Sequence, residues 1–200
     1  QDSPYEIFTA SEFLLLMKQI RYGMDLSGKF FVLTSDINLG GYGLDSTAVD
    51  ETSSFKGTLD GKGHKVYHFV PAFSDKDYKG LFGYVDGVLK NIGFEMDISL
   101  NLDSDNEIYA GLVVGKLNGT LKNVYVKGKI SVSSNRNVHV GGMVGYNIGT
   151  IEDCYSDVVV SISSSKLMAY AGGLVGYNDG TVHGSFAVGN VSASGYDKAY

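Results

Sequence analysis

The chain has 200 residues, enough for one domain or for a short stretch of a longer repeat protein. Its 16 basic and 22 acidic residues leave a formal charge of −6 without a block of like charges, which argues against a nucleic-acid-binding protein. The longest apolar run, residues 13–17, is too short to cross a bilayer, and no segment has the pattern of a signal peptide.

Residues 10–22 have the pattern of an amphipathic α-helix. Thr9 and Glu12 form a capping-box pattern at its start, and Gly23 provides a stop. Apolar residues recur at helical spacing on one face: Phe13, Leu16, Met17 and Ile20. We predict that this helix belongs to an N-terminal segment, residues 1–27, which covers one end of the structure that follows.

Two short apolar segments, residues 29–33 and 37–39, are predicted as the first β-strands. Residues 40–56 are expected to form an irregular excursion. A weak first copy of a repeat follows at residues 55–61, in which Gly57 and Gly61 keep the spacing of four that later copies show.

Four clear copies of a glycine motif then recur with a period of about 31 residues. A Thr or Val and then an apolar residue follow each second glycine. One later column contains Asn91, Asn123, Asp153 and Gly184. The paired glycines, predicted to be structural turn glycines, are Gly83 and Gly87, Gly115 and Gly119, Gly145 and Gly149, and Gly176 and Gly180.

Each period holds short, alternating, β-branched runs, which are typical of strands joined by tight turns. Helical repeats would not tolerate so many glycines, no leucine-rich frame is present, and a propeller blade needs about 40 residues. We therefore predict an all-β fold, a right-handed parallel β-helix (solenoid) of about five coils with an N-terminal capping α-helix. The β-helix should occupy residues 28–200. The pattern leaves open which of two adjacent apolar columns faces the lumen. One column is Leu81, Val113, Met143 and Leu174, and the other is Phe82, Val114, Val144 and Val175.

The last copy of the repeat is predicted to be incomplete. Tyr109, His139 and Tyr170 each precede a glycine motif, and Tyr200 falls in the same column. We expect the array to be truncated there, so that its last coil is covered by a further coil or by another partner. Without a cover, the exposed strand edge favours end-to-end self-association.

The segments 141–150 and 172–181 resemble the GLUG repeat of bacterial surface proteins. Segments 28–39 and 55–66 are similar to the lead-in that often precedes such repeats. The resemblance implies a β-solenoid and a secreted or cell-surface location, in adhesin-like proteins or in non-catalytic regions of surface peptidases that cut immunoglobulin A. It implies no catalytic residues. Lys116 departs from the Tyr of the motif, so we expect surface features to be interrupted there.

Metal and cofactor chemistry is weakly indicated. His64 and His68 have metal-like spacing but no third ligand, and the lone Cys154 is expected to be a small core residue. Segments 40–45 and 103–107 resemble the beginnings of calcium loops, and each is better explained as a solvated loop. We predict no metal and no cofactor.

Three carboxylates are candidates for catalysis on polysaccharides, as in β-helix lyases and hydrolases: Asp60, Asp86 and Asp179. Each precedes a glycine at a turn, where aspartate is favoured because it bonds to its own backbone. A role in turns is the better interpretation, and no catalytic residue is predicted.

Aromatic residues fall into repeated columns. Tyr125, Tyr155 and Phe186 share one register, and Tyr84, Tyr146 and Tyr177 share another. Stacked aromatics stabilise neighbouring coils, and a tyrosine strip can also bind sugar or protein. The candidate ligand-binding strip is Tyr125, Tyr155, Phe186, Tyr146 and Tyr177.

The sequence favours a non-catalytic, secreted or cell-surface binding or spacer module, for adhesion to a host protein or to polysaccharide. A polysaccharide lyase or hydrolase, and an accessory region of a large surface peptidase, are the alternatives. No nucleic-acid partner and no transmembrane segment are expected.

Overall fold

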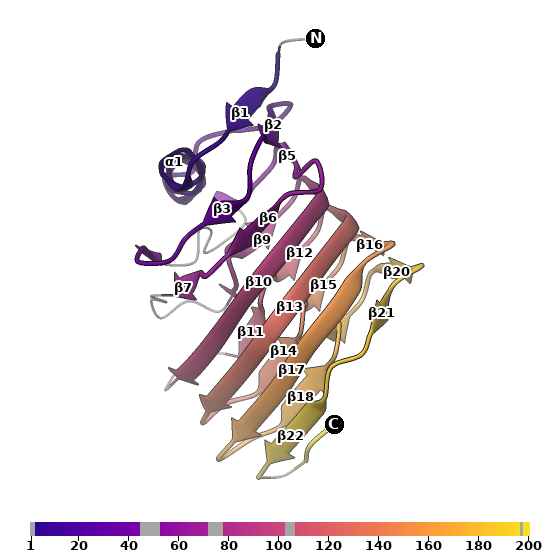
Figure 1. The fold of residues 1–200 in the computed structure, drawn as a ribbon. Helices are drawn as coiled ribbons and strands as arrows, with labels where there is room; N and C mark the ends of the chain where they lie inside the picture. The colour runs from indigo at the N-terminus through magenta and orange to yellow at the C-terminus, as the bar shows by residue number, and fades with distance from the viewer. Residues whose placement is uncertain (1–2, 45–52, 72–77, 103–106, 197) are drawn as a thin grey trace.

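The computed structural model describes residues 3–44, 53–71, 78–102, 107–196 and 198–200. In these ranges the chain forms a parallel β-solenoid of about five turns with a single short helix near the N-terminus (Figure 1). The predicted fold class is therefore confirmed. Within the same ranges, no helix has the length and apolar character needed to cross a bilayer.

The helix α1 (Ala10–Arg21) begins at the predicted capping box. The Thr9 side chain accepts a hydrogen bond from the Glu12 amide at 3.3 Å, and the Glu12 carboxylate accepts from the Thr9 amide at 2.9 Å. The four predicted apolar residues are buried and join the hydrophobic core. Gly23 has a φ of 70° and ends the helix.

The N-terminal end contains a strand as well as the helix, and the sequence interpretation missed this strand. Strand β1 (Tyr5–Ile7) pairs in parallel with β2 (Phe30–Leu33), so it adds a further rung to the main sheet. The Tyr5 ring stacks on Phe31 with centroids 5.3 Å apart. The division into residues 1–27 and 28–200 stays a prediction.

The first turns are irregular. Their strands are β3 (Ile37–Asn38), β4 (Gly43–Leu44), β5 (Thr58–Asp60), β6 (Lys65–Tyr67) and β7 (Val70–Pro71). Strands β2 and β5 continue the main sheet, whereas β4 and β7 form a separate pair.

Regular turns follow, each with two short strands and one long segment. The first comprises β8 (Tyr78–Lys79), β9 (Phe82–Val85) and β10 (Val88–Leu102), and the second β11 (Ile108–Gly111), β12 (Val114–Leu117) and β13 (Thr120–Ser134). The third comprises β14 (Val138–Gly141), β15 (Val144–Asn147), β16 (Thr150–Glu152) and β17 (Tyr155–Ser164). The last comprises β18 (Ala169–Gly172), β19 (Val175–Asn178), β20 (Thr181–His183), β21 (Phe186–Ala187) and β22 (Val191–Gly195).

The turns stack in register and form three parallel sheets. The main sheet contains β10, β13 and β17, whose long strands lie side by side in Figure 1. The other two sheets have the orders β18-β14-β11-β8 and β19-β15-β12-β9. Val114 pairs with Val144, and Val144 with Val175, so the columns found in the sequence are the columns of the structure.

A sharp bend lets both adjacent apolar columns face the core. The chain bends between β11 and β12, at Leu112 and Val113, and again between β14 and β15. Val113 and Val114 are therefore both buried, as are Met143 and Val144. Adjacent residues of a straight strand would point to opposite faces, and the bend removes that restriction.

The Asn/Asp column marks a left-handed backbone kink. Asn91, Asn123 and Asp153 have φ values of 50°, 51° and 53°, and Gly184 has 59°. Asn and Asp tolerate this conformation better than other side chains, which explains why the column accepts them or glycine. The kink also resets the alternation: Leu121 and Val124 both point inward, with two exposed residues between them.

The first glycine of each pair lies where two neighbouring sheets approach each other closely. Gly83, Gly115, Gly145 and Gly176 lie within strands rather than in turns, which differs from the sequence prediction. A Cβ atom on Gly145 would lie 2.5 Å from the amide nitrogen of Ala110, and one on Gly176 would lie 2.7 Å from that of Val140. Neighbouring sheets approach closely at these glycines.

Cys154 is a core residue, as the sequence predicts, because only 1% of its surface is exposed. Burial raises the pKa of its thiol to about 11, which keeps it protonated and unreactive at neutral pH.

The last turn leaves apolar side chains uncovered. Val191 is 44% exposed although the equivalent Val160 of the preceding turn is fully buried. We expect the 200-residue chain to self-associate through this edge, and Val191→Lys to weaken that association. Light scattering over a concentration series measures it. Val159→Lys is the matched control, since Val159 is 41% exposed on a covered turn. A mass that does not change with concentration would contradict the expectation.

Candidate functional site

The predicted aromatic strip divides between two sheets. Tyr125, Tyr155 and Phe186 lie on β13, β17 and β21 of the main sheet, in paired register. Tyr146 and Tyr177 pair with each other on β15 and β19 of a different sheet. The five residues therefore form two separate surfaces rather than one strip.

The column on the main sheet is held by local contacts. The Tyr125 ring lies against the backbone of Gly93, where a Cβ atom would be 2.1 Å from the ring. Its hydroxyl donates to the Glu95 carboxylate at 3.5 Å. Tyr155 and Phe186 contact each other with centroids 4.9 Å apart. Phe186, on the last of these turns, is 59% exposed.

The second column continues through the position where the sequence departs from the motif. The Lys116 ammonium lies 5.1 Å from the Tyr84 ring centroid, 5.4 Å from that of Tyr78 and 5.8 Å from that of Tyr146. Cation–π attraction therefore replaces an aromatic contact at this turn. The row of rings is interrupted at Lys116, as the departure from the motif predicts, while contacts between neighbouring turns continue through its ammonium group.

A third column completes this surface. Tyr78, Tyr109, His139, Tyr170 and Tyr200 contact one another in sequence, with centroids 4.5 to 5.8 Å apart. Four of its members, all except Tyr78, were visible in the sequence as a shared register, but they were left out of the predicted strip.

The second and third columns touch and form one surface. The Tyr109 ring stacks on Tyr146 at 5.2 Å, and Tyr177 meets the His139 ring edge-on at 5.3 Å. We call this surface the aromatic ladder. It comprises Tyr78, Tyr84, Tyr109, Lys116, His139, Tyr146, Tyr170, Tyr177 and Tyr200.

The stacking limits what the aromatic ladder can bind. The ring planes of His139 and Tyr170 differ by 2°, and those of Tyr170 and Tyr200 by 6°. Rings stacked in this way cover each other's flat faces, which a sugar would need for contact. The arrangement favours the stabilisation of neighbouring turns over ligand binding.

A small polar cluster lies at the centre of the aromatic ladder. The Glu107 carboxylate accepts a hydrogen bond from the Tyr109 hydroxyl at 2.7 Å and pairs with His139 Nε2 at 2.9 Å. Burial acts to raise the pKa of Glu107, but these contacts outweigh it and the pKa is lowered. Burial and Glu107 together raise the pKa of Tyr109. His139 is 5% exposed, and its Nδ1 has no hydrogen-bond partner among the described residues.

Asp60 is engaged in a turn and in a ladder between turns of the solenoid. Its carboxylate accepts from the Lys62 amide at 3.0 Å and from the Asn91 side chain at 3.1 Å, and Asn123 donates to Asn91 at 2.9 Å. Burial acts to raise the pKa of Asp60, yet these bonds and the ammonium groups of Lys62 and Lys90 lower it.

The other two candidate carboxylates also have local partners. Asp86 accepts from the Ser54 hydroxyl at 3.0 Å and from the Asn118 side chain at 2.6 Å. Asp179 accepts from the Tyr146 hydroxyl at 3.0 Å. Each carboxylate thus joins two turns of the solenoid, which agrees with a structural role.

We expect the contribution of Asp60 to stability to disappear in acid. Its pKa is lower in the folded protein than the value of about 3.9 in an unfolded chain, so ionised Asp60 stabilises the fold above that pH. The stabilisation is lost as the pH falls through the folded pKa. Asp60→Asn should therefore lower Tm at about pH 7 and have a smaller effect near pH 2.5. Asp157→Asn, at an exposed site, is the control; an Asp60→Asn deficit that persists in acid would contradict the prediction.

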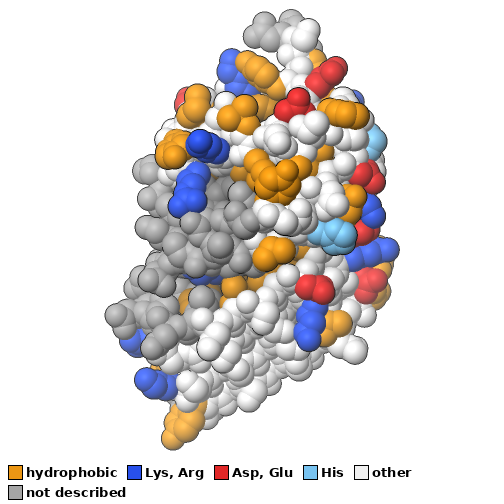
Figure 2. Space-filling model, turned by 60° about the vertical axis from the view of Figure 1, so that its left-hand side comes forward, with side chains coloured by type: hydrophobic (Ala, Val, Ile, Leu, Met, Phe, Trp, Pro, Cys, Tyr) orange, Lys and Arg blue, Asp and Glu red, His pale blue; other side chains and the backbone are white. Residues whose placement is uncertain are grey.

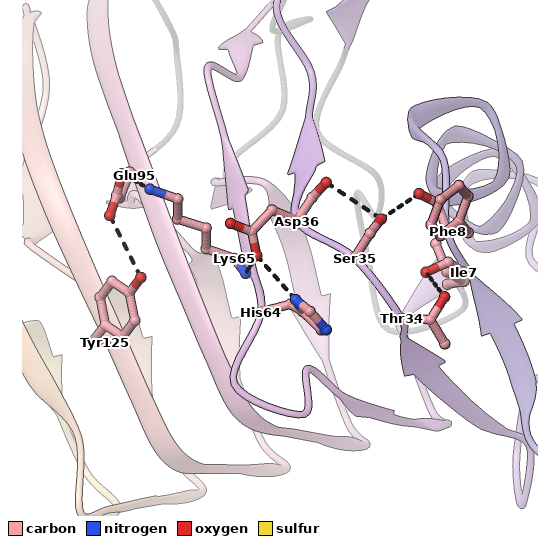
Figure 3. A network of polar contacts seen from close by, with 9 residues as sticks. All are labelled: Ile7, Phe8, Thr34, Ser35, Asp36, His64, Lys65, Glu95 and Tyr125. Carbon is pink, nitrogen blue, oxygen red and sulfur yellow. Dashed lines mark hydrogen bonds and ion pairs between the residues drawn. The ribbon is translucent and has the colours of Figure 1, made fainter.

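The two histidines with metal-like spacing have other partners. His64 Nδ1 lies 3.1 Å from the Asp36 carboxylate, and His68 Nδ1 lies 3.1 Å from the Asn38 side-chain oxygen. Figure 3 shows His64 within a chain of polar contacts that crosses several turns. The described residues contain no group of three or more potential metal ligands. The calcium-like segments include Asp45 and residues 103–106, which lie outside the described residues.

Comparisons with known proteins give one sequence relative and one structural relative. No protein-family model matches the chain. An alignment 143 positions long, which covers 65% of this chain and 2% of the other, is 32% identical to halomucin of Haloquadratum walsbyi. The fold is similar to a Bacteroides ovatus crystal structure described as a "putative immunoglobulin A1 protease". The TM-score is 0.50 and the identity 15%, over 96% of this chain and 84% of that one, so the likeness concerns the fold alone.

Proposed function

We propose that the chain is a non-catalytic module of a secreted or cell-surface protein, which binds a host molecule or polysaccharide or spaces other domains from the surface. The main observation in support is that the side chains suggestive of catalysis hold the solenoid together. Asp60, Asp86 and Asp179 each bond to residues of a neighbouring turn. A carboxylate committed in this way is a poor general acid or base, because proton transfer requires hydrogen-bonding reach to a substrate.

The resemblances support the same proposal. The GLUG-like segments suggest a bacterial surface protein. The fold likeness also favours the narrower alternative that the chain is an accessory region of a larger surface peptidase. Because the sequence match spans 2% of the halomucin chain, the activity of that whole protein does not transfer.

The test combines binding with turnover. The purified chain is applied to an array of host glycans and bacterial and plant polysaccharides, and the same polysaccharides are incubated with it and analysed for shortened products. We expect retention on at least one surface and no shortened products. Degradation that disappears in Asp60→Asn, Asp86→Asn or Asp179→Asn would overturn the proposal in favour of a lyase or hydrolase.

A further inference from the structure

A hollow of about 690 Å³ opens where the short N-terminal strands meet the longer strand β10. It lies on the outer side of the main sheet, between β6, β7, β10 and β13. Its lining includes Tyr67, His68, Val70, Glu95, Asp97 and Lys127. None of these residues belongs to the aromatic ladder or to the predicted aromatic strip.

The hollow results from a step in the sheet. Strand β6 pairs with β10 only as far as Tyr67, which lies opposite Glu95. The next residue, His68, has a φ of 59° and turns the chain away, while β10 continues to Leu102. Contacts of His68 with the Glu95 carbonyl at 3.1 Å and with Asn38 hold this turn.

One wall of the hollow is apolar. The Val70 side chain is 56% exposed, and the half-buried Tyr67 ring lies beside it with the Lys65 ammonium 5.2 Å from its centroid. The His68 ring packs edge-on against Tyr67, with centroids 4.8 Å apart. Figure 2 shows hydrophobic side chains beside histidine, acidic and basic ones in the middle of one face of the molecule.

The side of the hollow opposite this wall carries three charged side chains, those of Glu95, Asp97 and Lys127. Lys65 fixes the Glu95 carboxylate at 2.8 Å, and Tyr125 adds a hydrogen bond, as Figure 3 shows. The Asp97 carboxylate is not paired with any described residue, in contrast to Glu95. Lys127 lies opposite Glu95 on β13, with its ammonium 6.0 Å from the Tyr125 ring centroid.

We propose that this hollow binds a pyranose unit of a neutral polysaccharide. An apolar wall suits the C–H face of a sugar ring, and a few placed polar groups suit its hydroxyls. Glu95 and Asp97 accept hydrogen bonds from hydroxyl groups, and Lys127 donates one to a ring or hydroxyl oxygen. This inference rests on the proposed binding function and locates it away from the aromatic ladder.

The charge of the site offers no net attraction for anionic ligands. Glu95 and Asp97 are balanced by Lys127 in the lining and by Lys65, which pairs with Glu95. Phosphate, sulfate or uronate groups would find no excess of positive charge there, and the chain carries a formal charge of −6, which favours a neutral sugar over nucleic acids and acidic polysaccharides. The described residues also do not form a metal-binding cluster at the hollow.

The test maps binding by NMR on the 200-residue chain. Hexasaccharides of glucose, xylose, mannose and galactose are titrated into the ¹⁵N-labelled protein, with hexagalacturonate as the anionic comparison. We expect at least one neutral hexasaccharide to shift the amide signals of residues 67–70, 95–97 and 127–128. Asp97→Ala should weaken that binding about tenfold, as for the loss of a charge-assisted hydrogen bond.

Control variants separate the hollow from other surfaces. Glu6→Ala removes an exposed carboxylate on β1, a strand that does not line the hollow, and should leave affinity unchanged. Tyr177→Ala removes an exposed ring of the aromatic ladder and should also leave it unchanged. Shifts at the ladder alone, with Asp97→Ala unaffected, would overturn the hollow site but leave the proposed function intact. Preference for hexagalacturonate, or no shift at the hollow with any sugar, would also overturn it.

Discussion

Gly119→Ala is expected to destabilise the protein by about 3 kcal/mol or more, which corresponds to a loss of roughly 10 °C in Tm for a chain of this size. A Cβ atom on Gly119 would lie 1.9 Å from the carbonyl oxygen of Gly87, in the turn stacked beneath it. That oxygen also accepts a hydrogen bond from the Thr120 amide at 2.9 Å, so moving either turn away from the added methyl group would break this hydrogen bond. Thermal and urea unfolding followed by circular dichroism measure the effect.

Gly28→Ala is the matched control for this prediction. Gly28 has a φ of 71°, and a Cβ atom added there would have no other atom within 4 Å, so the cost is only that of left-handed backbone, about 1–2 kcal/mol. The close approach between stacked turns would be refuted if Gly119→Ala cost no more than Gly28→Ala.

Phe82→Ala is expected to lower the free energy of unfolding by about 3–5 kcal/mol. The Phe82 side chain is fully buried between the rings of Phe55 and Phe94, with centroid distances of 5.8 and 6.4 Å. Its removal leaves a cavity where the irregular first turns pack against the regular ones. Urea unfolding monitored by tyrosine fluorescence measures the change.

The same substitution at Phe186 provides the comparison. Phe186 is 59% exposed on the last turn and contacts Tyr155. Phe186→Ala should therefore cost about 1 kcal/mol or less. Burial of Phe82 indicates a large contribution to the stability of the core. Equal losses of unfolding free energy for Phe82→Ala and Phe186→Ala would contradict it.

The repeat could be recognised in the sequence because each turn of a solenoid needs the same kinds of residue at the same positions. The columns aligned in the sequence, such as Val114 with Val144, are neighbours in the structure. The capping box at Thr9 and Glu12 is likewise a local pattern, in which two side chains satisfy nearby amides. Cys154 was identifiable as core because its column in the repeat also holds Ile92 and Val124.

The candidate binding surfaces could not be predicted as well from the sequence. Whether Tyr125 and Tyr146 share a face depends on how many sheets each turn contains and where the chain bends between them. The repeat does not encode that information as a simple alternation, since Leu112 and Val113 both point inward. The sequence therefore placed residues from two sheets on one strip.

The hollow beside Tyr67 had no sequence signal. Its wall depends on where β6 ends against β10, and its carboxylates come from a strand about 30 residues later in the chain. His68 would have been the available clue, but positive φ at a non-glycine residue cannot be read from residue type alone.

The sequence by itself determined the β-solenoid, its period, the recurring Asn/Asp column and the helix near the N-terminus, because these features arise from contacts repeated in every turn or confined to a few neighbouring residues. Only the tertiary structure decided which columns face the core, how Lys116 replaces an aromatic ring in the aromatic ladder, and which charged groups meet at the hollow. These depend on bends and strand ends that bring different columns together in space.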